Sequence, residues 1–198
     1  ITAALAPNAE AAKRLAREAI VEDERIYGAS VAWLDGLAFW PLEKEPLRTE
    51  VRAWLTAGKS IPPAKVDLAR QASTLVAFDF ITGNWDRYSG ENVGIDKTGT
   101  VVLYIDNDAA FMEAPPKALV ERNKMLLDAT DRFSRDLVTR ARAIDEAELA
   151  RVLGDESPGR PLLTKAAVSL VAGRMKDLVR VVDAKIAARG EAETLYFR

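Results

Sequence analysis

The stretch from Phe78 to Phe111 constrains the fold of this chain most strongly, and it reads FDFITGNWDRYSGENVGIDKTGTVVLYIDNDAAF. It contains two short β-prone runs joined by the turn sequence Asp96-Lys97-Thr98-Gly99, and the second run extends from Val101 to Ile105. A turn rich in Asp and Gly between β-prone runs is typical of a hairpin, which returns the backbone after a few residues. We therefore expect a small β-hairpin in this part of the chain.

The same stretch carries three polar residues that a hairpin can bring to one pocket. Asp86 lies in a loop rich in Gly and Asn, Asn92 closes that loop, and Asp106 follows the second run. Two carboxylates and an amide supply hard oxygen ligands that suit Mg²⁺, which keeps few protein ligands and adds waters and substrate phosphates. In phosphoryl transfer one Asp orients the attacking hydroxyl, an Asn a few residues later holds metal, and an Asp at a strand end holds the metal that bridges the phosphates. The alternative is a solvated, Asx-rich hairpin, because Asp, Asn and Gly are ordinary turn residues.

Two motifs in this stretch resemble those of a known group of kinases. The first is Gly83-Asn84-Trp85-Asp86-Arg87, and the second is Ile105-Asp106-Asn107-Asp108-Ala109-Ala110-Phe111. Together they resemble the four-jointed and secretory-pathway kinases with their bacterial relatives, and more distantly the phosphatidylinositol and HipA-type kinases. The resemblance covers roughly Gly28 to the C-terminus. It implies a kinase-like phosphotransferase that uses ATP with Mg²⁺ or Mn²⁺.

The resemblance also implies roles for single residues. Asp86 would be the catalytic base, with Arg87 beside it among the catalytic residues, and Asn92 and Asp106 would be metal ligands. Asn92 falls one position later than is usual in protein kinases, which weakens its assignment relative to that of Asp106. Asn84 would contribute to the nucleotide site.

The apolar run from Ala29 to Leu34 has two interpretations. By the resemblance it links the lobes and lines the adenine pocket, with Trp33 and Leu34 as nucleotide-binding residues; otherwise it is an ordinary core strand. Arg87 also has a second interpretation. Asp79 lies at the end of an expected helix, where the helix dipole disfavours an acid, so Asp79 needs a partner and Arg87 is the candidate.

Composition excludes several classes of chemistry. The chain of 198 residues has no His and no Cys, which rules out Ser-His-Asp and Cys-His catalysis and His- or thiolate-ligated metal sites. Its net charge of −2 gives no long-range attraction for nucleic acid, and no apolar stretch is long enough to span a bilayer. Any chemistry must therefore use carboxylates, amides, hydroxyls, Lys or Arg, and a hard cation.

The remaining patterns predict a mainly α-helical chain with the small hairpin, and an irregular connection over Leu37–Pro46. By the resemblance this is the larger, C-terminal lobe of a protein-kinase-like fold whose smaller lobe is truncated or missing. Residues 1–27 would be a remnant of the smaller lobe and residues 28–198 the larger lobe, in one compact unit. We expect helices over 8–26, 49–57, 65–80, 117–127, 131–143, 145–153 and 162–189, and an aromatic C-terminal end that folds back onto the domain.

Two parts of a kinase are missing from the sequence: a Gly-rich loop over the phosphates and a strand Lys that pairs with them. Either the strands that hold the nucleotide lie upstream of Ile1 or on a partner chain, or the protein is a pseudokinase-like scaffold that binds a partner protein. A metal-dependent phosphohydrolase built on the same carboxylates is a third possibility. The acceptor, whether protein, lipid, sugar or small molecule, and the compartment are left open by the sequence.

Overall fold

The computed structural model describes residues 8–18, 20–22, 25–27, 35–88, 91–154 and 163–198. The chain divides into two compact units, Ile1–Asp35 and Gly36–Arg198. No helix in these described ranges combines the length and apolar character needed to cross a membrane.

The first unit contains one helix and one hairpin. Helix α2 spans Ala9–Glu18, and strand β1 (Ile20–Glu22) pairs antiparallel with β2 (Arg25–Tyr27). The prediction of a helix that continues to Ile26 is therefore wrong beyond Glu18. The β-branched Ile20 and Val21 and the aromatic Tyr27 favour strands, and cross-strand pairing outweighs the near-helical spacing of the apolar residues. Trp33 and Leu34 lie outside the described residues.

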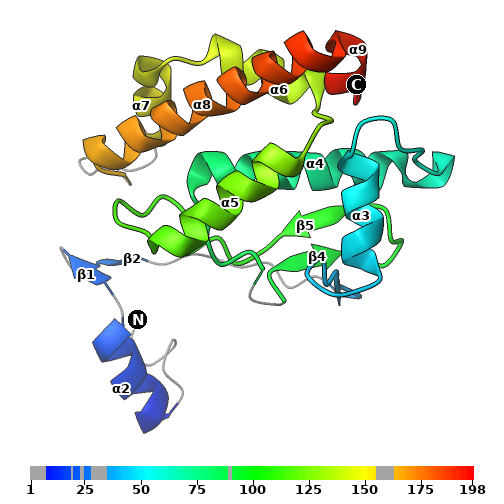
Figure 1. The fold of residues 1–198 in the computed structure, drawn as a ribbon. Coiled ribbons are helices and arrows are strands. Elements are labelled where there is room, and N and C mark those ends of the chain that lie inside the picture. The colour runs from blue at the N-terminus through cyan, green and yellow to red at the C-terminus, as the bar shows by residue number, and fades with distance from the viewer. Residues whose placement is uncertain (1–7, 19, 23–24, 28–34, 89–90, 155–162) are drawn as a thin grey trace. The chain divides into compact units, whose positions relative to one another are not determined.

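The second unit is mainly helical, as the sequence predicts, with a small antiparallel sheet of three strands (Figure 1). Its helices are α3 (Leu47–Leu55), α4 (Val66–Thr82), α5 (Lys117–Ala129), α6 (Arg135–Ala143), α7 (Glu146–Gly154), α8 (Lys165–Arg189) and α9 (Glu191–Thr194). Each of the longer helices coincides with an expected one within a few residues. Helix α6 begins later than expected because Ser134 is its N-cap, with the hydroxyl accepting a bond from the N–H of Leu137.

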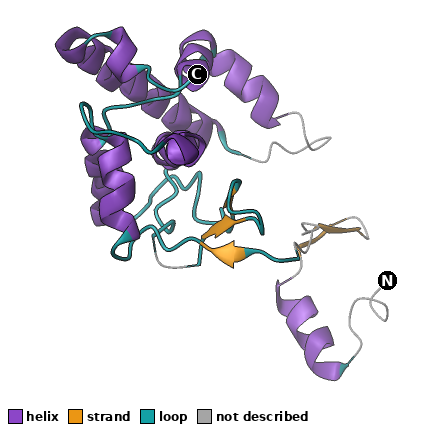
Figure 2. Cartoon of the chain, turned by 90° about the vertical axis from the view of Figure 1, so that its right-hand side faces the viewer, coloured by secondary structure: helices purple, strands orange, loops and turns teal. Residues whose placement is uncertain are grey.

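The sheet consists of β3 (Ala38–Phe39), β4 (Val93–Ile95) and β5 (Val102–Tyr104) in that spatial order. Strands β4 and β5 form the expected hairpin, with Gly94 opposite Leu103. The carboxylate of Asp96 closes the turn by accepting bonds of 2.9 Å from the N–H groups of Thr100 and Val101. Strand β3 pairs with β4 inside the segment that was expected to be irregular, so that prediction is wrong there. Figure 2 shows the strands in orange beside the helices.

Helix α4 is the central element of the second unit. It packs against α8, α5 and strand β5, so that it lies between the long C-terminal helix and the sheet (Figure 1). A helix covered on several sides must be apolar around most of its circumference, and Leu68, Ala72, Leu75 and Val76 of α4 are all buried. This burial fixes the position of the residues that follow α4, where the candidate site begins.

The C-terminal end folds back as expected. Phe197 is buried in the main hydrophobic core, and its N–H donates to the carbonyl of Phe133. The carbonyl of Phe197 in turn accepts a bond from the N–H of Arg135. These backbone bonds hold the last residues against the start of α6.

Candidate functional site

The candidate site begins where α4 ends. Gly83 adopts a left-handed conformation with φ +69°, which terminates the helix and turns the chain into the loop that carries Asp86. The N–H of Phe111, beyond the hairpin, donates to the carbonyl of Thr82 over 2.8 Å. This bond therefore joins the last residue of the second motif to the residue that directly precedes the first motif.

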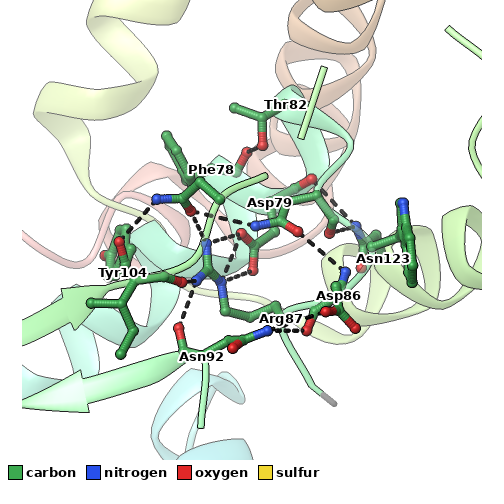
Figure 3. A network of polar contacts seen from close by, with 12 residues as sticks. Phe78, Asp79, Thr82, Asp86, Arg87, Asn92, Tyr104 and Asn123 are labelled. Atoms are coloured by element: carbon green, nitrogen blue, oxygen red, sulfur yellow. Dashed lines mark hydrogen bonds and ion pairs between the residues drawn. The ribbon is translucent and has the colours of Figure 1, made fainter. Parts of the chain in front are cut away.

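A buried ion pair lies beneath the loop. The Nε of Arg87 donates to both carboxylate oxygens of Asp79 over 3.1 Å, and Nη2 donates to Oδ1 over 3.1 Å (Figure 3). Asp79 is 2% exposed and Arg87 is 1% exposed. The partner that the sequence assigns to Asp79 is confirmed.

The same guanidinium also binds the backbone of the hairpin. Its Nη1 donates to the carbonyls of Asn92 and Ile105, each over 2.6 Å, and its Nη2 donates to the side-chain oxygen of Asn107. Arg87 thus joins α4, the end of the loop that carries Asp86 and the end of β5. Because it is almost fully buried and its contacts are internal, Arg87 serves here as a positioning residue; its predicted place among the catalytic residues stays a prediction.

Burial changes the acidity of this pair. Removal from water raises the pKa of the Asp79 carboxyl to about 6, although the hydrogen bonds and charge of Arg87 act in the opposite direction. Burial also raises the pKa of the Tyr88 and Tyr104 hydroxyls above their ordinary value, with the charge of Asp79 contributing. Both tyrosines are therefore neutral at physiological pH, and neither is a nucleophile there.

Asp86 is held by amide side chains. The backbone N–H of Asp86 donates to Oδ1 of Asn84 over 3.2 Å, and Nδ2 of Asn92 donates to the carbonyl and Oδ2 of Asp86 over 2.8 and 3.3 Å. Asn92 thus closes the loop on Asp86, as the sequence predicts. Asn84 is fully buried and orders the loop from within, and its predicted contact with a nucleotide remains a prediction.

Asp106 follows β5 and has a left-handed backbone with φ +52°, a conformation that Asp tolerates better than most residues. The pKa of its carboxyl is raised, first by a hydrogen bond with Asp108, then by the charge of Asp108, with burial and the charge of Asp86 contributing less. Arg87, next to Asp86, donates to the carbonyl of Ile105, next to Asp106, so the backbone segments that carry the two carboxylates meet at one guanidinium. That the two carboxylates face one metal ion stays a prediction.

The donor set suits a hard divalent cation. Two carboxylates that repel each other, with an amide beside one of them, are the ligand types that Mg²⁺ prefers, and a cation would relieve the repulsion. Among the described residues, no group of three acidic side chains is arranged to hold a metal ion by itself. The ligand set would therefore be Asp106, Asn92, waters and substrate oxygens.

No protein-family model, curated protein or solved structure matches this chain. The resemblance to kinases therefore stays a prediction that rests on the two sequence motifs.

Several residues of the site could not be found from the sequence. Asn123 on α5 donates from Nδ2 to the carbonyl of Asn84 over 2.6 Å and to that of Asp79 over 3.3 Å. Arg122 donates from Nη2 to the carbonyl of Trp85 over 2.6 Å. Both residues lie on an ordinary amphipathic helix, and no local signal distinguishes them. Asp108 and its hydrogen bond with Asp106 were also missed, although Asp108 lies within the second motif.

Proposed function

We propose that the second unit is the larger lobe of a protein-kinase-like phosphotransferase that uses ATP with Mg²⁺. The observation that supports the proposal is that Asn92 bonds to Asp86, while Arg87, next to Asp86, bonds the carbonyls of Asn92 and of Ile105, which directly precedes Asp106. The absence of His and Cys supports it, because the proposed chemistry needs only carboxylates, an amide and a hard cation.

In this proposal Asp86 accepts the proton of the acceptor hydroxyl. Its carboxylate is partly exposed, so a substrate can reach it, and the bond from Asn92 to Oδ2 limits its rotation. Asp106 and Asn92 would hold the metal ion, which when bound neutralises charge on the transferring phosphoryl group. The buried pair of Asp79 and Arg87 keeps these three residues at fixed positions, and fixed positions are a large part of what phosphoryl transfer requires.

The test is transfer of labelled phosphate from ATP, together with calorimetric titration of nucleotide with and without Mg²⁺. The chain should be measured alone and within the longest open reading frame that contains it, because a Gly-rich loop and a strand Lys would strengthen nucleotide binding. Asp86→Asn should retain Mg²⁺-dependent nucleotide binding and lose transfer by about 10²-fold or more. Asp106→Asn should lose the Mg²⁺ dependence of binding.

Asp128→Asn is the matched control, because Asp128 is an exposed carboxylate on α5 away from these residues. It should leave binding and transfer unchanged. Release of free phosphate in place of transfer would identify a phosphohydrolase. Absence of Mg²⁺-dependent nucleotide binding, both by the chain and by the product of the longest reading frame that contains it, would refute the proposal and favour a pseudokinase-like scaffold.

A further inference from the structure

A cavity of about 270 Å³ lies where α3, α4 and α5 meet the segment around Leu42 and the side chain of Tyr88. Most of its wall is apolar and includes Leu42, Val51, Leu55, Val76 and Leu126. Pockets for small molecules are largely apolar with a few polar groups, and they typically measure about 300–1,000 Å³. This cavity is slightly smaller than that range, so its occupant must be small.

The polar groups of the cavity are mainly cationic. Arg48, Arg52 and Arg122 line it together with one acid, Glu43. Arg48 is paired with Glu45, whereas neither Arg52 nor Arg122 has a carboxylate within ion-pair distance in the described part of the chain. The Nε of Arg122 is buried and has no hydrogen-bond acceptor among the described residues. An apolar wall with two guanidinium groups that make no direct ion pair in the described part of the chain is complementary to an apolar molecule that carries one negative charge.

The cavity is also connected to the loop of Asp86. Arg122 donates to the carbonyl of Trp85, and its guanidinium lies 5.2 Å from the centre of the Tyr88 ring. Trp85 and Tyr88 precede and follow Asp86 closely in the chain. A molecule that binds Arg122 therefore shares that side chain with the backbone that carries Asp86.

We propose that this cavity binds a small amphipathic carboxylate of the medium-chain fatty acid type. Its apolar chain packs against the leucines and valines of the wall, and its carboxylate accepts hydrogen bonds from Arg52 and Arg122. A single negative charge suits the site because Glu45 pairs with Arg48 and Glu43 offsets a second positive charge, which leaves one of the three arginine charges unbalanced. Because Arg122 also bonds the carbonyl of Trp85, the bound carboxylate shares a side chain with the backbone next to Asp86, and this coupling holds whether or not Asp86 takes part in phosphoryl transfer.

The test is calorimetric titration of the full chain with octanoate, with octan-1-ol and octyl phosphate in parallel. Octanoate should bind at one saturable site, and octan-1-ol, which has no charge, should bind at least tenfold more weakly. Octyl phosphate should not bind more tightly than octanoate. Octanoate should also change the fluorescence of the tryptophans, of which Trp85 is held by Arg122.

Two variants locate the site. Arg52→Glu reverses an exposed charge at the rim and should weaken octanoate binding at least fivefold. Ala129→Phe adds a ring at an exposed lining position and should reduce binding to below detection. Lys176→Glu is the control: it makes the same charge change on an exposed face of α8 that does not line the cavity, and it should bind octanoate like the unaltered chain.

Any of three results would overturn the proposal. The first is no saturable binding of octanoate at millimolar concentration. The second is equal binding by the Arg52→Glu variant and the unaltered chain, which would mean that the charge is not recognised there. The third is tighter binding of octyl phosphate than of octanoate, which would assign the site to a phosphorylated ligand. Should Ala129→Phe fail to fold, Arg52→Glu still decides the question.

Discussion

Replacing Arg87 by methionine removes the guanidinium that joins α4 to the hairpin. At pH 7.5 we expect the free energy of unfolding to fall by about 3–5 kcal/mol, since removing one partner of a buried ion pair leaves the other charge uncompensated. The carbonyls of Asn92 and Ile105 lose their donor as well. A buried acceptor without a partner costs about 1–3 kcal/mol, so the loss should lie at the upper end of this range.

The loss should depend on pH in a defined direction. The pKa of Asp79 in the folded protein is about 6, above its unfolded value, so the folded state binds a proton that the unfolded state releases. The stability that this proton contributes is fully present below the unfolded pKa and is lost as pH rises through the folded pKa. Without Arg87 the folded pKa of Asp79 rises further, because the interactions that lower it are gone. The Arg87→Met variant therefore takes up the proton at a higher pH. The difference in free energy of unfolding between the unaltered chain and the variant should shrink as pH falls from 7.5 to 5.5.

Urea denaturation followed by tryptophan fluorescence at these two pH values measures both effects. The double variant Asp79→Asn, Arg87→Met should be more stable than Arg87→Met at pH 7.5, because no charge remains buried. Arg142→Met is the control: it breaks the exposed pair with Asp183 and should change stability by less than about 1 kcal/mol. A loss of less than about 1 kcal/mol in the free energy of unfolding for Arg87→Met, or a loss that grows as pH falls, would refute the reasoning.

Two further substitutions test the packing of the second unit. Phe197→Ala should lower the free energy of unfolding by about 3–5 kcal/mol, because Phe197 is buried. Tyr196→Ala, at an exposed position, should lower it by only about 1 kcal/mol. Equal losses for the two variants in urea denaturation would contradict the burial of the C-terminal end. Burial raises the pKa of Asp131, but bonds from the N–H of Ala57 and from Lys185 outweigh it and hold that pKa below its ordinary value. The stability that the Asp131 carboxylate contributes is therefore present above the unfolded pKa and lost as pH falls through the folded pKa. Asp131→Asn should lower the free energy of unfolding by about 1–3 kcal/mol at pH 7 and by much less near pH 3. Asp128→Asn, the control, should leave it unchanged at both pH values.

The hairpin and the pair of Asp79 and Arg87 could be predicted because their signals are local. The turn sequence from Asp96 to Gly99 fixes how the two runs pair, and the position of Asp79 near a helix C-terminus requires a nearby cation. Asp79 and Arg87 are only eight residues apart, so few alternative partners compete.

The parts that could not be predicted depend on contacts between distant segments. Asn123 meets the carbonyl of Asn84 across 39 residues of sequence, and strand β3 is a two-residue segment that exists only because β4 offers it an edge. In residues 20–27 the apolar spacing fits a helix as well as a hairpin, and pairing between the two strands decides the outcome.

The buried charges of the site hold its structure, whereas its exposed charges are accessible from solvent. The pair of Asp79 and Arg87 is neutral as a unit and buried, so it fixes the backbone without adding net charge to the surface above it. Asp106 and Asp108 are exposed and Asp86 is partly exposed, and these three carboxyl groups leave that surface negative. A negative surface on a rigid base attracts a cation without rearrangement. Substitution of Arg87 should therefore lower stability and, under the proposed function, phosphoryl transfer as well, whereas substitution of Asp86 by Asn should abolish the proposed transfer and leave stability nearly unchanged.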